Sequence, residues 1–239
     1  MAGYFRVNRF FAQKLAPLLK EDDIIWVHDY HLIPLAAELR QMGFKNKIGF
    51  FLHIPWPPAD VLFTMPVHEQ IMRGLSQYDL VGFQTDFDLD NFGGGLVREG
   101  IGERIDGGKK FSTFGRTFKG GAYSISIETE IFSKFAIKAE KNAMVRKARQ
   151  SVEGKDLIIG VDRLDYSKGI TQRIDAFEQF VATNPDHHNK VTYLQITPKS
   201  RSEVPEYEQM QRMVAEQAGR VNGAIGTVDW VPIRYINRS

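Results

Sequence analysis

Four short segments of the chain place charged or polar side chains where a strand is expected to end. They are His28–His31, Leu52–Pro55, Asp162–Gly169 and Pro198–Arg201. In an open parallel sheet, ligands bind at the carboxyl ends of the strands. These segments are therefore the places where binding or catalysis is expected.

The segment Asp162–Gly169 holds Arg163 and Lys168 just before a predicted helix. A guanidinium is a planar bidentate donor, an ammonium is a compact charge, and the first turn of a helix offers unsatisfied N–H groups. Together these groups suit a small anion such as a diphosphate or a sugar-nucleotide phosphate. The alternative is that Arg163 pairs with Asp162 or Asp165 and Lys168 lies free in solvent. The spacing does not choose between the two.

Two residues of the first half also stand at expected strand ends. Asp29 could accept hydrogen bonds from two neighbouring sugar hydroxyls, act as a base or nucleophile, or cap the helix that follows it. His53 lies between an apolar run and the proline-rich turn Ile54–Pro58, as a core histidine or as a donor to a substrate oxygen. Both residues are candidates for contact with a sugar.

His28 and His31 invite a metal interpretation, but they straddle a strand-to-helix turn and no third ligand has a suitable spacing. We therefore expect no metal site. Arg201 is a further candidate for binding an anion. Its alternative is a surface arginine near the start of a helix that Ser200 or Ser202 caps.

The elements that would position these residues follow an α/β pattern, because short apolar runs alternate with amphipathic stretches. The expected strands are Ile24–His28, Lys47–Leu52, Leu80–Phe83, Ser124–Ile127, Leu157–Val161, Val191–Ile196 and a short one near Val228–Trp230. The expected helices cover approximately residues 32–42, 68–75, 132–152, 174–181 and 203–223.

Three glycine clusters interrupt this pattern at Gly93–Gly95, Gly107–Gly108 and Gly120–Gly121. None follows a strand and opens a helix, as a phosphate-binding loop would, and no P-loop motif occurs. The clusters are predicted to be loops and hairpin turns.

Composition narrows the function classes. The chain has 239 residues, a net charge of +2 and no cysteine, which excludes disulfides, thiol nucleophiles and cysteine-ligated zinc or iron–sulfur centres. The small net charge argues against nucleic acid as a partner, and the apolar runs are far shorter than the ~20 residues of a membrane helix. We expect a cytoplasmic protein with no membrane contact. Its first residues are expected to form an amphipathic helix, and not a presequence, with an apolar face at Val7, Phe10, Phe11, Leu15, Leu18 and Leu19.

From spacing alone, two function classes remain open. One is a transferase that acts on a phosphorylated sugar or nucleotide. The other is a non-catalytic module that binds such a molecule.

At the same junctions the sequence resembles the trehalose-6-phosphate synthases of glycosyltransferase family 20. Members of this family are retaining glucosyltransferases that join glucose from UDP-glucose to glucose 6-phosphate. The resemblance covers essentially the whole chain. The matching segments are Trp26–Pro34, Gly49–Pro55, Gly160–Gly169, Ser200–Arg201, Val204–Tyr207, Gly219–Gly223 and Asp229–Ile233.

The resemblance implies a GT-B fold with the active site between two Rossmann-like, parallel-sheet domains, and no cofactor. The implied catalytic residues are His53 and Asp29. Asp29 would hold hydroxyls of the acceptor glucose 6-phosphate, and His53 would contact the donor sugar near the bond that breaks. Ile54, beside His53, would contribute to anomer selectivity.

On the nucleotide side, the resemblance implies that Arg163 and Lys168 bind the diphosphate of UDP-glucose and that Arg201 binds the acceptor phosphate. Two cations that face the charge developing on UDP can take the place of a metal ion. Retention in this family is explained by front-face attack, in which the leaving phosphate takes the proton of the acceptor. This suits a sequence with no obvious carboxylate nucleophile.

The resemblance also divides the chain. Residues 1–135 match the later part of the N-terminal, acceptor-side domain, and residues 136–239 match a linker helix and the early part of the C-terminal, nucleotide-sugar domain. The family continues on both sides of the match, so we expect an internal portion in which both domains are incomplete. Open sheet edges favour association, so a homo-oligomer is among the expected states.

Two alternatives to the synthase stay open. One is a related glucosylglycerol-phosphate synthase, which would use glycerol 3-phosphate as the acceptor. The other is an inactive fragment that only binds UDP or a phosphosugar.

Overall fold

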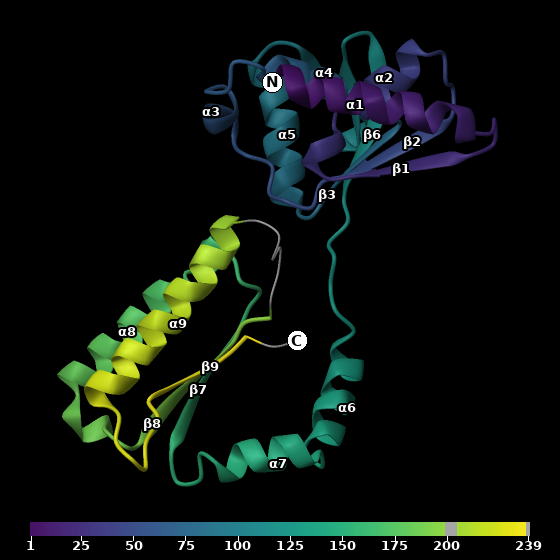
Figure 1. Cartoon of the computed structure of the whole chain (residues 1–239). Coiled ribbons are helices and arrows are strands. Elements are labelled where there is room, and N and C mark those ends of the chain that lie inside the picture. The colour runs from purple at the N-terminus through teal and green to yellow at the C-terminus, as the bar shows by residue number, and fades with distance from the viewer. Residues whose placement is uncertain (199–204, 238–239) are drawn as a thin grey trace. The chain divides into compact units, whose positions relative to one another are not determined.

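The computed structural model describes residues 1–198 and 205–237 (Figure 1). The chain divides into two compact units, which we call unit 1 (Met1–Ile127) and unit 2 (Glu128–Ser239). Each unit contains its own sheet and its own apolar core. Every helix within the described ranges is too short or too polar to span a membrane.

Unit 1 is built on a six-stranded sheet with the order β1-β2-β3-β6-β5-β4. Strands β1, β2, β3 and β6 are parallel, whereas β4 and β5 form an antiparallel edge. The first three predicted strands are confirmed, with β2 ending one residue earlier than expected. The bounds are β1 Ile24–His28, β2 Lys47–Phe51, β3 Leu80–Phe83, β4 Gly102–Ile105, β5 Lys110–Thr113 and β6 Arg116–Ala122.

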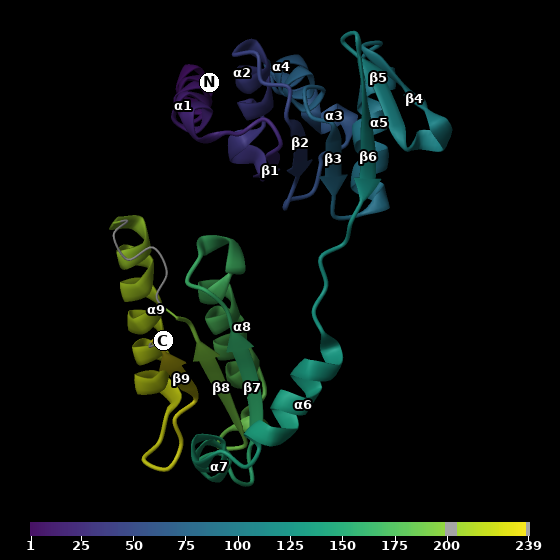
Figure 2. The same cartoon turned by 90° about the vertical axis from the view of Figure 1, so that its right-hand side faces the viewer.

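Helices cover one face of this sheet (Figures 1 and 2). Along β1, Ile25 and Val27 are buried under them, whereas Ile24 and Trp26 point to the other face and are exposed. The strand therefore separates a packed face from an open one. The helices are α1 Ala2–Leu15, α2 Leu35–Gln41, α3 Ala59–Leu62, α4 His68–Leu75 and α5 Asp86–Arg98, with short 3₁₀ turns η1 Ala16–Leu18, η2 Tyr30–Leu32 and η3 Asp106–Gly108.

Helix α1 forms as predicted, but only part of the predicted apolar face is packed: Leu15 and the following Leu19 contact the core. Phe10 and Phe11, expected on the packed side, are about half exposed, and the buried residues are Asn8 and Ala12. The Asn8 side-chain amide donates to the carbonyl of His31 at 3.0 Å. The small side chain of Ala12 lets the helix approach closely, so the packed face is shifted from the phenylalanines toward Asn8 and Ala12.

Two of the three glycine clusters are wrongly predicted as loops or turns. Gly93–Gly95 lie inside α5 and Gly120–Gly121 inside β6, whereas Gly107–Gly108 do lie in a turn. A Cβ on Gly120 would lie only 2.3 Å from the ring of Phe111. Glycine is placed here because an aromatic core residue packs directly on the backbone.

Unit 2 has a three-stranded parallel sheet with the order β7-β8-β9. Helices α8 and α9 lie side by side against it (Figures 1 and 2) and bury Phe177 and Val214 with Trp230 in its core. The predicted long helix at 132–152 is two helices, α6 and α7. The bounds are α6 Thr129–Ala139, α7 Ala143–Gln150, β7 Asp156–Val161, η4 Tyr166–Lys168, α8 Ile170–Thr183, η5 Pro185–His187, β8 Val191–Ile196, α9 Pro205–Ile225 and β9 Ile233–Ile236.

Two predicted strands are wrong. Residues 124–127 follow the end of β6 and lie outside the sheet. Near 228–230 the chain makes a turn, and the third strand of unit 2 begins only at β9. The apolar signal there comes from Trp230, which is 2% exposed and donates its indole N–H to the carbonyl of Val191 at 2.8 Å. A buried tryptophan in a turn thus produced the apolar pattern from which a strand was expected.

Candidate active site

The ends of β1 and β2 bring Asp29 and His53 together in unit 1. The two strands are parallel neighbours, with His28 opposite Phe51, so the segments that follow them leave the sheet at the same edge. The backbone N–H of Asp29 donates to the carbonyl of Phe51 at 2.8 Å. In return, Oδ1 of Asp29 accepts the backbone N–H of His53 at 3.3 Å. These two bonds join the segments that carry both candidates.

Asp29 has a backbone conformation that is unusual for a residue with a Cβ. Its φ is 69° and its ψ is 164°, a region that costs of order 1–3 kcal/mol and is often found at functional sites. The side chain makes no capping hydrogen bond to η2, so the capping alternative is wrong. Its Oδ2 lies 4.0 Å from Nδ1 of His31, and the side chain is 25% exposed. The carboxylate is thus held in place with one edge open to a ligand.

His53 is exposed, so the core-histidine alternative is also wrong. Its Nε2 lies 2.9 Å from Nδ1 of His28, and its ring packs edge-on against Phe51 with the centroids 4.9 Å apart. The sequence pattern presents His28 only as a metal candidate and does not predict this contact. The available signal is the position of both histidines at the ends of adjacent parallel strands. Among the residues the structure describes, no three His, Asp or Glu side chains cluster as a metal site would require.

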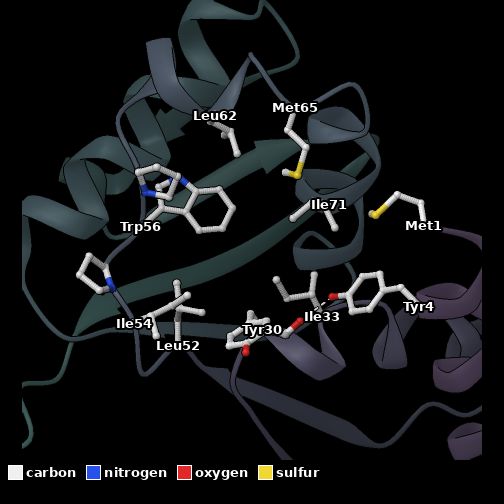
Figure 3. Close-up of a pocket in the computed structure, with 12 residues that line it drawn as sticks. Met1, Tyr4, Tyr30, Ile33, Leu52, Ile54, Trp56, Leu62, Met65 and Ile71 are labelled. Atoms are coloured by element: carbon white, nitrogen blue, oxygen red, sulfur yellow. Dashed lines mark hydrogen bonds between the residues drawn. The ribbon is translucent and has the colours of Figure 1, made fainter. Parts of the chain in front are cut away.

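Ile54 is 44% exposed and lines an apolar hollow of about 370 Å³ (Figure 3). Leu52 and Tyr30 lie beside Ile54 on one side of the hollow, Trp56 lies across from them, and Tyr4 lies at the other end. Burial raises the pKa of Tyr4 to about 12, so its neutral hydroxyl donates to the carbonyl of Tyr30 at 2.5 Å. The hollow offers shape and apolar contact, which suits a residue expected to influence which anomer fits.

In unit 2, the segment between β7 and α8 presents Arg163 and Lys168. Leu164 between them is 3% exposed and anchors the segment in the core. Asp165 caps η4 because its Oδ1 accepts the backbone N–H two residues later at 2.9 Å. Gly169 then adopts φ 60°, a left-handed conformation that glycine allows without strain, and α8 begins at the next residue. The sequence thus turns directly from strand to helix with both cations on the connection.

The nearest carboxylates do not neutralise Arg163. Asp162 accepts a hydrogen bond from Nη2 of Arg173 on α8 at 2.6 Å. Within residues 1–198 and 205–237, neither Arg163 nor Lys168 forms a salt bridge, and both are exposed. The alternative that pairs Arg163 with Asp162 or Asp165 is therefore wrong, whereas the exposure of Lys168 agrees with either interpretation. As far as the described residues show, both positive charges remain available to an anion.

Arg201, predicted to bind the acceptor phosphate, lies outside the described residues. The structure therefore shows the candidates as two sets. Unit 1 carries Asp29, His53 and Ile54, and unit 2 carries Arg163 and Lys168.

The ends of parallel strands thus carry a carboxylate and an imidazole in unit 1 and two cations in unit 2. Comparison with known proteins identifies the family. The chain belongs to glycosyltransferase family 20, whose model matches residues 1–239. It is 74% identical over 239 residues to the trehalose-6-phosphate synthase of Sinorhizobium fredii (strain NBRC 101917 / NGR234), covering 100% of this chain and 51% of that protein.

Solved structures share the fold. The alpha,alpha-trehalose-phosphate synthase (UDP-forming) of Burkholderia xenovorans in complex with glucose-6-phosphate is 42% identical, with a TM-score of 0.86 over 100% of this chain and 53% of that one. An E. coli structure bound with UDP-2-fluoro glucose is 38% identical, with a TM-score of 0.84 over 100% of this chain and 52% of that one. The predicted fold class, α/β of the GT-B glycosyltransferase type, is confirmed. The chain spans about half the length of the relatives it matches.

Proposed function

We propose that the chain takes part in the reaction of a retaining glucosyltransferase, which moves glucose from UDP-glucose to glucose 6-phosphate. The products are α,α-trehalose 6-phosphate and UDP. The observation that carries this proposal is a pair of cations, Arg163 and Lys168, that no described residue neutralises, at a strand end of a chain that is 74% identical to a trehalose-6-phosphate synthase.

Unit 2 is the proposed nucleotide side. When the glycosidic bond to UDP breaks, negative charge develops on the diphosphate, and Arg163 and Lys168 stabilise it together with the N–H groups of the first turn of α8. A preorganised donor of this kind is typically worth about 10²–10³ in rate. The leaving phosphate takes the proton of the attacking acceptor hydroxyl, so no protein carboxylate has to bond to the sugar.

Unit 1 is the proposed acceptor side. The open edge of the Asp29 carboxylate can accept hydrogen bonds from sugar hydroxyls, and the N–H of His53 holds that carboxylate in position. His53 is proposed to contact the donor sugar, and Ile54 to limit how the sugar fits beside the hollow. Arg201 is proposed to bind the acceptor phosphate.

The comparisons support the two substrates by class. A relative is described in complex with glucose-6-phosphate, and another structure is described as bound with UDP-2-fluoro glucose. A cytoplasmic location and a homo-oligomer stay predictions.

The test is an assay of UDP release from UDP-glucose and glucose 6-phosphate. Arg163→Ala should lower turnover about 10²-fold or more, whereas Arg212→Ala, at an exposed arginine of α9, should leave it unchanged. Turnover that is insensitive to Arg163→Ala would refute the site. A preference for glycerol 3-phosphate in acceptor competition would favour the glucosylglycerol-phosphate synthase, and tight UDP binding without turnover would favour a binding module.

A further inference from the structure

The contact between His28 and His53 lies at the unit 1 strand ends, and the proposed reaction does not use it. Nδ1 of His28 and Nε2 of His53 are 2.9 Å apart, and the ring planes meet at 33°. Trp26 packs on the outer side of His28 with the centroids 4.4 Å apart, and Phe51 packs on His53. Four aromatic rings therefore form a row in which the two imidazoles touch through nitrogen.

The backbone keeps these two rings in register. His28 ends β1, and the strained Asp29 follows it and binds the next strand through the carbonyl of Phe51 and the N–H of His53. Because both bonds span the two strand ends, neither imidazole can shift along its strand without breaking one of them. The contact is a built feature of the sheet edge.

A nitrogen-to-nitrogen hydrogen bond needs one donor and one acceptor. Two protonated nitrogens cannot face each other at this distance, and two bare lone pairs gain nothing. If Nδ1–H of His28 donates, then Nε2 of His53 carries a lone pair, and the proton of the neutral His53 ring must be on Nδ1. The partner ring thereby fixes the tautomer of His53.

We infer that His28 is a positioning residue: its Nδ1–H donates to Nε2 of His53, which leaves His53 with Nδ1–H as a donor for an oxygen of the donor sugar. In the opposite assignment, the only N–H of the neutral His53 ring would be used on His28, and the ring could not donate to a ligand. The choice between the two assignments rests on the proposed function, whereas the tautomer can be measured on the chain by itself.

The test is the long-range ¹H–¹⁵N correlation spectrum of the full chain, in which protonated and bare imidazole nitrogens have well-separated shifts. His53→Gln identifies the signals of His53. In the unmodified chain, Nδ1 of His53 should have the shift of a protonated nitrogen and Nε2 that of a bare one. His28→Asn places an amide N–H near the position of Nδ1 and should preserve this pattern.

His28→Phe removes the donor and should return His53 to a mixture in which Nε2–H dominates, as in free neutral histidine. His28 is exposed, so both variants should melt with the unmodified chain. His187→Phe in unit 2 is the matched control and should leave the His53 signals unchanged. A proton on Nε2 in the unmodified chain, or the same tautomer in His28→Phe, would overturn the inference.

A kinetic measurement separates this inference from the proposed function. His28→Phe should lower kcat about tenfold, the factor that one hydrogen bond supplies, with an unchanged KM for glucose 6-phosphate and recovery in His28→Asn. No UDP release by the unmodified chain would refute the proposed function and leave the tautomer result standing. An unchanged kcat together with a changed tautomer would refute the role of His28 in the reaction.

Discussion

The polar side chains at the strand ends are arranged in opposite ways in the two units. In unit 1, the polar groups at the ends of β1 and β2 contact one another. Asp29 accepts the backbone N–H of His53, and the ring of His28 contacts the ring of His53. In unit 2, Arg163 and Lys168 form no salt bridge within the described part of the chain. The difference indicates that unit 1 offers a ligand polar groups in fixed positions, whereas unit 2 offers it positive charge that no described side chain neutralises.

The same contrast extends to how each segment is supported. Asp29 relies on a strained backbone that the neighbouring strand holds in place, while the loop of unit 2 relies on the buried Leu164 and on Gly169. Each strand end should therefore depend on the core of its own unit.

The largest expected effect comes from Phe92→Ala in the core of unit 1. Phe92 is fully buried and packs against Trp56, Phe83 and Phe111, so its loss should cost about 3–5 kcal/mol of unfolding free energy. Phe87→Ala on the same helix, where the ring is 69% exposed, is the control and should cost little. Hydrogen exchange should show lost protection in unit 1 alone. An equal loss in unit 2 would show that the two units do not have independent cores.

Next in size is the response of UDP binding to charge. Arg163→Ala should weaken UDP binding about 10–100-fold, since a hydrogen bond to a charged group contributes about 1.5–3 kcal/mol. Asp29→Asn should leave UDP affinity unchanged, because the acceptor side carries no diphosphate contact in this account. Isothermal titration calorimetry measures both, and equal losses in the two variants would contradict the division of roles.

Asp29 itself separates the charge of the carboxylate from its hydrogen bond to His53. Asp29→Asn keeps an oxygen acceptor and should raise the KM for glucose 6-phosphate about tenfold through the lost charge. Asp29→Ala also removes the acceptor of the His53 N–H and should add a destabilisation of about 1 kcal/mol. Kinetics and urea unfolding of both variants check this. An alanine variant as stable as the asparagine variant would show that this hydrogen bond does not stabilise unit 1.

The smallest effects are pH-dependent and have opposite signs in the two units. In unit 1, the hydrogen bond to Glu99 raises the pKa of His68 above its usual 6.5. This bond should therefore stabilise unit 1 fully below that pH, and its contribution should be lost as pH rises through the raised pKa. In unit 2, the hydrogen bond from Arg220 lowers the pKa of Glu178 below its usual 4.5. The ion pair of Arg220 with Glu178 should stabilise unit 2 fully above pH 4.5, and its contribution should be lost as pH falls through the lowered pKa.

Melting curves of His68→Gln and Glu178→Gln at several pH values check these signs. His68→Gln should destabilise at about pH 5 and have little effect at about pH 8, whereas Glu178→Gln should still destabilise at about pH 8. The same pH trend in both variants would mean that these pairs do not set the pH response of their units.

The sequence predicts the parallel strands and the ends where the candidates lie, because buried strands read as apolar runs and the chemistry follows them. It does not predict the φ of Asp29 or the contact of His28 with His53, since both depend on the register between β1 and β2. It also misplaces the glycines of α5 and β6. There, glycine gives room to Phe111, and local sequence does not distinguish such packing from a turn.

The division of binding between the two units can be measured in an amide ¹H–¹⁵N spectrum of the chain, titrated first with UDP and then with glucose 6-phosphate. We expect UDP to shift the amides of Arg163, Lys168 and the first turn of α8, and glucose 6-phosphate to shift those of Asp29 and His53. Shifts from UDP centred on the strand ends of unit 1, or no saturable shifts from either ligand, would contradict this division.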